Sequence, residues 1–147
     1  MVEEALRLGV NYIDTAYPYH GGESESFLGE VLEGRAREDL VLATKMPSWK
    51  VESSDDFDRF LDEQLQRLRT EFVDLYLLHA LKDSHWTKLS GLGVLQWAEA
   101  KIADGVIGGL GFSFHDSFDV FLRILGAWDH WAQVLLMYNY LDRDYQA

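Results

Sequence analysis

The sequence of 147 residues contains no cysteine. Disulfides, thiolate metal sites and a cysteine nucleophile are therefore excluded within this chain, and the absence is compatible with a reducing compartment. The sequence also has no uninterrupted apolar stretch near the roughly 18 residues of a membrane-spanning helix. Its charged start, MVEEALRLG, lacks the apolar centre of a signal peptide. We expect a globular, cytoplasmic protein that does not enter a membrane.

Basic residues are scarce as well. Lys and Arg number 13 against 25 Asp and Glu, so the formal net charge is −12. This balance argues against nucleic acid or an anionic membrane surface as the main partner. It also opposes the binding of an anionic cofactor unless local cations offset the field. With 48% hydrophobic and 14% aromatic residues, the composition is that of a folded protein.

Short β-type stretches alternate with helical stretches along the chain. We expect about five strands, which end at Asp14, Lys45, His79, Ser113 and Asn139. Helices are expected at 2–8, 24–32, 54–68, 94–103 and 118–125, with Ser24 and either Ser53 or Ser54 as helix caps. Strict alternation implies a parallel sheet with right-handed crossovers. No linker divides residues 1–147, so we expect a single α/β domain.

Two parallel folds compete for this pattern. A doubly wound nucleotide-binding sheet usually has a glycine-rich turn after its first strand, but this chain has Thr-Ala-Tyr-Pro-Tyr-His there. Polar residues at successive strand ends are typical of the catalytic rim of a (β/α)8 barrel. The barrel is favoured, although it needs eight strands. The sequence therefore predicts a partial (β/α)8 barrel.

The polar strand ends suggest a reaction. Taken singly, a carboxylate that starts a turn, a solvated lysine and a structural histidine are ordinary features. In a parallel barrel, however, Asp14, Lys45 and His79 converge at one rim, and Tyr19 can fold back over it. A carboxylate fixes an ammonium group, the ammonium stabilises a phenolate, and an imidazole can orient a carbonyl. This combination suits protonation of a carbonyl oxygen while a hydride reaches its carbon.

Five motifs occur in a characteristic order: GVNYIDTAYPYHGGESESFLGEVL, LVLATKMP, FVDLYLLH, GLGFSFHDS and AQVLLMYNYLD. On these motifs the chain resembles the aldo-keto reductase family over almost its whole length. The resemblance implies a (β/α)8 barrel that binds NADPH or NADH and reduces small aldehydes and ketones. The motifs YPYHGGESE and GFSFHD are similar to those of a bacterial and archaeal branch of the family. Members of that branch carry a cysteine-rich iron–sulfur segment after the barrel. Without cysteine, we expect no iron–sulfur cluster and no other metal in this chain.

The resemblance also assigns the catalytic roles. Tyr19, five residues after Asp14, matches the family's proton donor, whereas Tyr17 does not. Lys45, paired with Asp14, resembles the lysine that tunes this tyrosine. His79 resembles the histidine that orients the substrate carbonyl.

Cofactor and substrate contacts follow from the same resemblance. Ser113 and Gln133 match positions that bind the nicotinamide carboxamide, and Asp14 is expected to contact the cofactor as well. Many members have Ser-Asn where this chain has Ser-Phe, so one amide contact is either lost or made by His115 or Asn139. Trp49 and His20, in loops of the expected rim, are candidates to line the substrate pocket beside His79.

The resemblance covers family strands two to six only. We therefore expect an incomplete barrel that lacks the first strand, the last two strands and many of the family's cofactor contacts. Two hypotheses follow. The chain is an NAD(P)H-dependent carbonyl reductase, or it is a catalytically silent partial barrel that acts by binding or by self-association through open sheet edges at 10–13 and 133–138.

Overall fold

A sheet of five parallel strands forms the centre of the computed structural model, which describes residues 1–137. The strands lie in the sheet in their order along the chain, each hydrogen-bonded in parallel to the next. Their bounds are β1 (Tyr12–Asp14), β2 (Val41–Met46), β3 (Val73–Leu81), β4 (Ile107–Phe114) and β5 (Gln133–Leu136). The predicted alternation and parallel pairing are confirmed. The predicted strand end at Asn139 lies outside the described residues.

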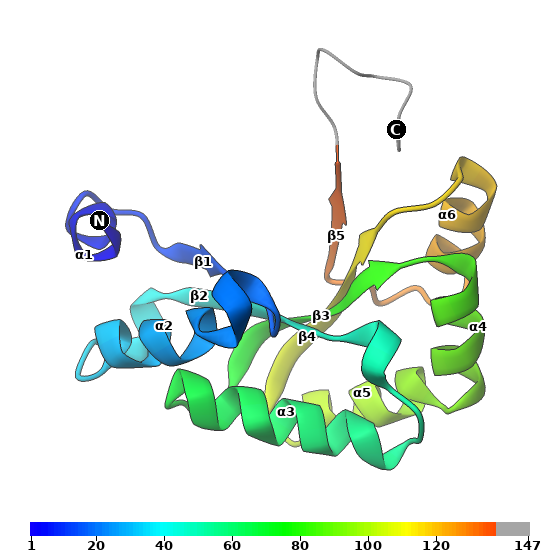
Figure 1. Ribbon diagram of the computed structural model, residues 1–147, viewed down its shortest axis with the longest axis horizontal. Helices are drawn as coiled ribbons and strands as arrows, with labels where there is room; N and C mark the ends of the chain where they lie inside the picture. The colour runs from blue at the N-terminus through cyan, green and yellow to red at the C-terminus, as the bar shows by residue number, and fades with distance from the viewer. Residues whose placement is uncertain (138–147) are drawn as a thin grey trace.

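Apart from the first helix, which precedes β1, the helices connect successive strands. They are α1 (Val2–Arg7), α2 (Ser24–Leu32), α3 (Asp55–Leu68), α4 (Asp83–Gly91), α5 (Val94–Ala103) and α6 (Phe118–Leu125). Three short 3₁₀ turns lie between them, η1 (Tyr19–Gly22), η2 (Arg37–Asp39) and η3 (Ser48–Lys50). Figure 1 shows the strands curving, with α2, α3 and α5 on one side of the sheet. The structure is a partial (β/α)8 barrel, as the sequence predicts.

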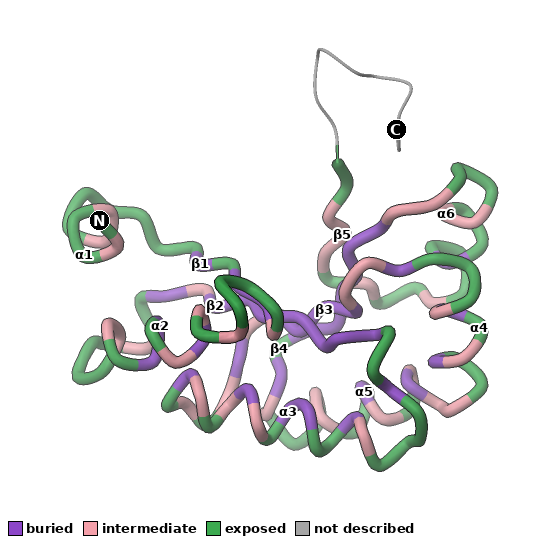
Figure 2. The backbone as a smooth tube through the Cα atoms, in the orientation of Figure 1, coloured by how far each residue is buried: buried purple, intermediate pink, exposed green. Residues whose placement is uncertain are grey.

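The core lies between the sheet and these helices. Its clearest contribution is the apolar stripe of α3, where Phe57, Phe60, Leu61 and Leu68 are all buried. Residues of β2 and β4 are buried along nearly their whole length, so side chains on both faces of these two strands are shielded from solvent (Figure 2). The strands that carry the site are therefore held from both sides.

The helix N-termini differ from the prediction. Ser54 is the N-cap of α3, but its side chain makes no capping hydrogen bond. The carboxylate of Asp56 instead accepts the backbone N–H groups of Glu52 and Ser53, at 2.7 and 3.0 Å. Ser24 is the first residue of α2 rather than its cap, and its hydroxyl accepts a hydrogen bond from Thr15. Ser54 therefore has the predicted N-cap position, although without a capping hydrogen bond, whereas the prediction of Ser24 as a cap is wrong.

Two segments extend beyond their predictions. Residues 83–91, where the sequence predicts no helix, form α4, which packs through the buried Trp86 and Leu89. Strand β3 does not end on His79 but continues to Leu81, with a register irregularity against β4 at this point. Ala80 within it has a left-handed φ of 51°. The chain turns at this bulge, directly after His79.

Helices α2 and α3 approach each other closely at Gly29. A Cβ atom added there would lie 2.3 Å from the backbone oxygen of Arg67. Only glycine fits this position, so the α2–α3 distance depends on its missing side chain. None of the helices among residues 1–137 has the length and apolar character needed to cross a membrane.

Candidate active site

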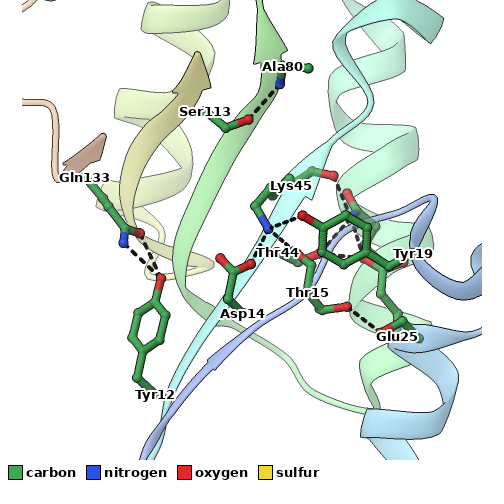
Figure 3. Close-up of polar contacts among 12 residues, drawn as sticks. Tyr12, Asp14, Thr15, Tyr19, Glu25, Thr44, Lys45, Ala80, Ser113 and Gln133 are labelled. Carbon is green, nitrogen blue, oxygen red and sulfur yellow. Dashed lines mark hydrogen bonds and ion pairs between the residues drawn. The ribbon is translucent and has the colours of Figure 1, made fainter. Parts of the chain in front are cut away.

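Lys45 is the centre of the predicted rim. Its side chain is only 2% exposed, because β2 lies inside the sheet with neighbours on both sides. The ammonium group pairs with the carboxylate of Asp14 and donates to the backbone oxygen of Thr15 at 2.6 Å. It also donates to the hydroxyl oxygen of Tyr19 at 3.3 Å (Figure 3). An ammonium has three donors, so these three oxygens satisfy it completely.

Tyr19 reaches Lys45 because of an unusual loop. Its backbone N–H donates to the oxygen of Ala16, and the next three residues have positive φ values: 53° at His20, 70° at Gly21 and 96° at Gly22. Glycine adopts this region without cost, whereas a histidine there is strained. The Tyr19 ring lies 4.7 Å from the Lys45 nitrogen, and the positive-φ residues that follow it lead the chain into α2.

His79 lies on β3, next to the strand that carries Lys45, and its ring lies beside that of Tyr19. The two rings meet edge to face with centroids 5.7 Å apart, and the ring of Trp49 also packs on the imidazole, with centroids 5.3 Å apart. Burial, followed by the positive charge of Lys45 and the nearby His115, lowers the pKa of His79 to about 4. The imidazole is therefore neutral at physiological pH. A neutral imidazole keeps one N–H that can donate to a carbonyl oxygen.

Ser113 lies on β4 next to the bulge of β3. Its hydroxyl oxygen accepts the backbone N–H of Ala80 at 2.7 Å, which leaves the hydroxyl proton available for a second partner. On β5, the side-chain amide of Gln133 contacts the hydroxyl of Tyr12 (Figure 3). A hydroxyl donor and an amide are groups that can bind a carboxamide. Ser113 and Gln133 thus carry groups with the hydrogen-bonding chemistry that a carboxamide requires.

The structure thus brings most of the predicted site residues together. Asp14, Tyr19 and Lys45 form one hydrogen-bonded group, and His79 and Trp49 adjoin it through ring contacts. His20 follows Tyr19 in the chain and, together with Asp14, lines a groove of about 650 Å³ bounded by α1, β1 and α2. Asn139 lies outside the described residues.

Sequence reasoning missed two contributions. The hydroxyl of Tyr12 contacts Gln133, although its position within a β-type run suggested only packing. A second group, formed by Glu25, Thr44 and Gln64, is buried behind Lys45. One residue in the sequence could have indicated this group: Gln64 is a polar residue at a position of α3 that continues the apolar stripe.

Comparisons with known proteins identify the family of this chain. A sequence model described as "Aldo/keto reductase family" matches residues 1–147. An uncharacterized oxidoreductase, YqkF, of Bacillus subtilis is 35% identical over 88 residues, which cover 54% of this chain and 28% of that protein. The 6-dehydroglucose reductase of Novosphingobium aromaticivorans is 38% identical over 91 residues, covering 54% of this chain and 30% of its own length.

Solved structures extend the likeness to the fold. An aldo-keto reductase from Klebsiella pneumoniae, in complex with NADPH, superimposes with a TM-score of 0.75 at 28% identity. The match covers 92% of this chain and 47% of that one. The chain thus spans less than a third of the two curated relatives in these matches and about half of this solved structure.

Proposed function

The chain belongs to the aldo/keto reductase family, and on that premise we propose that it carries the proton-donor side of an NAD(P)H-dependent carbonyl reductase. The substrate is a small aldehyde or ketone and the product is the alcohol. Tyr19 is the proton donor. Lys45 and Asp14 tune it, and His79 orients the substrate.

The observation that carries the proposal is the contact between Lys45 and Tyr19. The ammonium lies 3.3 Å from the phenol oxygen, and its charge is held in place by Asp14 and by the backbone oxygen of Thr15. When Tyr19 gives its proton to a carbonyl oxygen, the phenolate left behind lies next to a fixed positive charge. The neutral imidazole of His79 donates its N–H to the same carbonyl oxygen and so directs it toward Tyr19.

Bound NADPH or NADH would supply the hydride that adds to the carbonyl carbon. Within this chain, Ser113 can donate its free hydroxyl proton to the carboxamide oxygen of the nicotinamide, and Gln133 can pair with the carboxamide nitrogen. Asp14 lies on the same rim, and Asn139 is the fourth residue proposed for cofactor binding. Trp49, packed on His79, forms a wall of the substrate site, and His20 remains a candidate from the adjacent loop.

The proposal is tested by titrating the purified chain with NADPH while tryptophan fluorescence is monitored. The oligomeric state is measured in the same sample. Saturable binding at micromolar NADPH, with oxidation of NADPH when an aldehyde is added, is the expected result. Ser113→Ala is the matched variant, since it removes one hydroxyl from the proposed carboxamide site, and it should weaken binding. Absence of binding up to millimolar NADPH would contradict the proposal.

A second function, that of a catalytically silent partial barrel acting by association, is favoured by a different feature. The groove bounded by α1, β1 and α2 is lined mainly by apolar side chains, and Val10, Tyr12 and Phe27 in it are exposed. Sedimentation velocity over a range of concentrations tests this function. A dimer that dissociates in Phe27→Ser supports it, and a monomer at all concentrations contradicts it.

A further inference from the structure

Glu25 is completely buried, which is rare for a glutamate unless it is paired. One of its carboxylate oxygens accepts hydrogen bonds from the hydroxyl of Thr44 and the amide nitrogen of Gln64. The other lies 3.3 Å from the guanidinium of Arg67. This carboxylate therefore binds β2 and α3 at the same time.

Gln64 extends the contacts to Lys45. Its amide nitrogen also lies 3.1 Å from the backbone oxygen of Lys45, to which it donates, and its amide oxygen accepts the hydroxyl of Tyr76 at 2.7 Å. Glu25, Thr44, Gln64 and Tyr76 are all fully buried. Because these side chains are shielded from water, each polar group of the cluster depends on the others for its hydrogen bonds.

The cluster lies on the opposite side of β2 from the Lys45 ammonium. Side chains alternate along a strand, so Thr44 faces the helices while Lys45 faces the barrel interior. Glu25 is in the first turn of α2, which follows the loop of Tyr19 directly. The hydrogen bond from Thr15 to Ser24 connects the two ends of that loop. Glu25 therefore joins the end of the Tyr19 loop to the strand that carries Lys45.

We infer that Glu25 is a positioning residue, which fixes α2 against β2 and thereby sets the distance between the Lys45 ammonium and the Tyr19 hydroxyl. An apolar side chain could fill the same space, but it would not fix the direction of three donors. The carboxylate selects one register of α2 on β2. An effect of Glu25 on the rate of carbonyl reduction rests on the proposed function. Its effect on the position of the Lys45 ammonium does not.

The test follows the Lys45 ammonium directly by NMR. The chain is labelled with ¹⁵N-lysine, and the Lys45 signal is identified by its loss in Lys45→Met. In Glu25→Gln, which keeps the size of the side chain, the hydrogen-exchange rate of this ammonium is expected to rise about tenfold, because Lys45 separates more often from its three oxygens. In the matched control, Glu63→Gln, the rate stays within about twofold. Glu63 pairs with the same Arg67 and accepts the hydroxyl of Tyr17, a contact that the glutamine oxygen of Glu63→Gln can keep. Among the described residues, no hydrogen bond or ion pair joins Glu63 to β2.

Kinetics add a second readout in preparations that reduce carbonyls. Glu25→Gln should lower kcat by about 10- to 100-fold, because misplacement of a catalytic group by about 1 Å has effects of this size. The KM for NADPH should stay within about threefold, since Ser113 and Gln133 are unaffected. If the chain shows no reductase activity, the proposed function fails, and the NMR comparison alone decides the role of Glu25.

Two results would overturn the inference. One is a wild-type exchange rate in folded Glu25→Gln. The other is an equal rise in Glu63→Gln, which would assign the effect to the charge of Arg67. Should Glu25→Gln fail to fold, Thr44→Val removes only the hydroxyl that joins Glu25 to β2 and keeps the side-chain shape. The same rise is expected in Thr44→Val, and an unchanged rate in that variant would equally overturn the inference.

Discussion

The hydroxyl of Tyr12 lies 3.0 Å from the amide oxygen and 2.9 Å from the amide nitrogen of Gln133, 121 positions later in the chain. The two residues belong to β1 and β5, the first and last strands in the order of the sheet. Such a contact is possible only because the sheet curls strongly enough to bring these strands toward each other. It ties the side chain of Gln133, a residue of the proposed cofactor site, to β1.

Removing this hydroxyl should weaken the partial barrel. Tyr12→Phe is expected to lower the free energy of unfolding by about 0.5–1.5 kcal/mol, the usual net worth of a hydrogen bond. Urea unfolding measures the change. Gln133→Leu and the double variant complete the cycle, in which the two single effects should not add. Strictly additive effects would mean that the contact contributes nothing to stability.

Loss of the phenol of Tyr19 should remove most of the proposed reductase activity. Tyr19→Phe is expected to lower the rate of NADPH-dependent aldehyde reduction by about 10²–10⁴-fold, the usual size of a general-acid contribution. Tyr17→Phe is the matched control, because its hydroxyl contacts Glu63, at 3.3 Å, rather than Lys45. Equal rates for Tyr19→Phe and the unmodified chain would rule out Tyr19 as the proton donor.

Stability should decrease with acidification in a way that depends on His79. Its pKa in the folded chain is about 4, against an ordinary 6.5, because burial and the charge of Lys45 disfavour the imidazolium. Between these pH values the unfolded chain binds a proton that the folded chain does not. The contribution of His79 is thus fully present above pH 6.5 and is lost as the pH falls toward 4.

Urea midpoints measured from pH 7 to pH 4 test this dependence. The carboxylates titrate in the lower part of the same range, so the informative quantity is the difference between the unmodified chain and His79→Gln. The midpoint of the unmodified chain should fall more steeply between pH 6.5 and 4. Parallel curves for the two proteins would show that His79 does not titrate differently on folding.

Gly29→Ala should destabilise the chain by about 1–3 kcal/mol, the usual cost of inserting a methyl group into a packed contact. The new Cβ would lie 2.3 Å from the Arg67 oxygen and 2.9 Å from the carbonyl carbon of Leu68. Gly91→Ala is the control, because a Cβ at this helical position meets no atom within 4 Å. Thermal unfolding compares them, and an unchanged midpoint for Gly29→Ala would show that α2 can shift without loss.

The part of the site that the sequence predicts is the part formed by strand ends. Asp14 and Lys45 meet because neighbouring parallel strands place their carboxyl ends on one edge, a rule that needs no knowledge of side-chain packing. The extension of β3 past His79 was not predictable in this way. It depends on a left-handed φ at Ala80, and an alanine gives no sign of such a conformation.

Contacts between separate helices and strands could not be predicted from the sequence either. Glu25 reads as an acidic residue suited to a helix N-terminus, and only the packing of α2 on β2 and α3 buries it. Helix α4 was missed because only Trp86 and Leu89 on it are buried, too few to produce a periodic pattern. In each case tertiary contacts decide what local periodicity cannot.

The order of the sheet has a consequence for folding. Each strand of residues 1–137 pairs only with the strands before and after it in the sequence, so none has to insert between two that are already joined. The sheet can therefore grow one strand and one helix at a time while the ribosome synthesises the chain. The contact between Tyr12 and Gln133 has to wait for β5, and is thus among the last to form in that order.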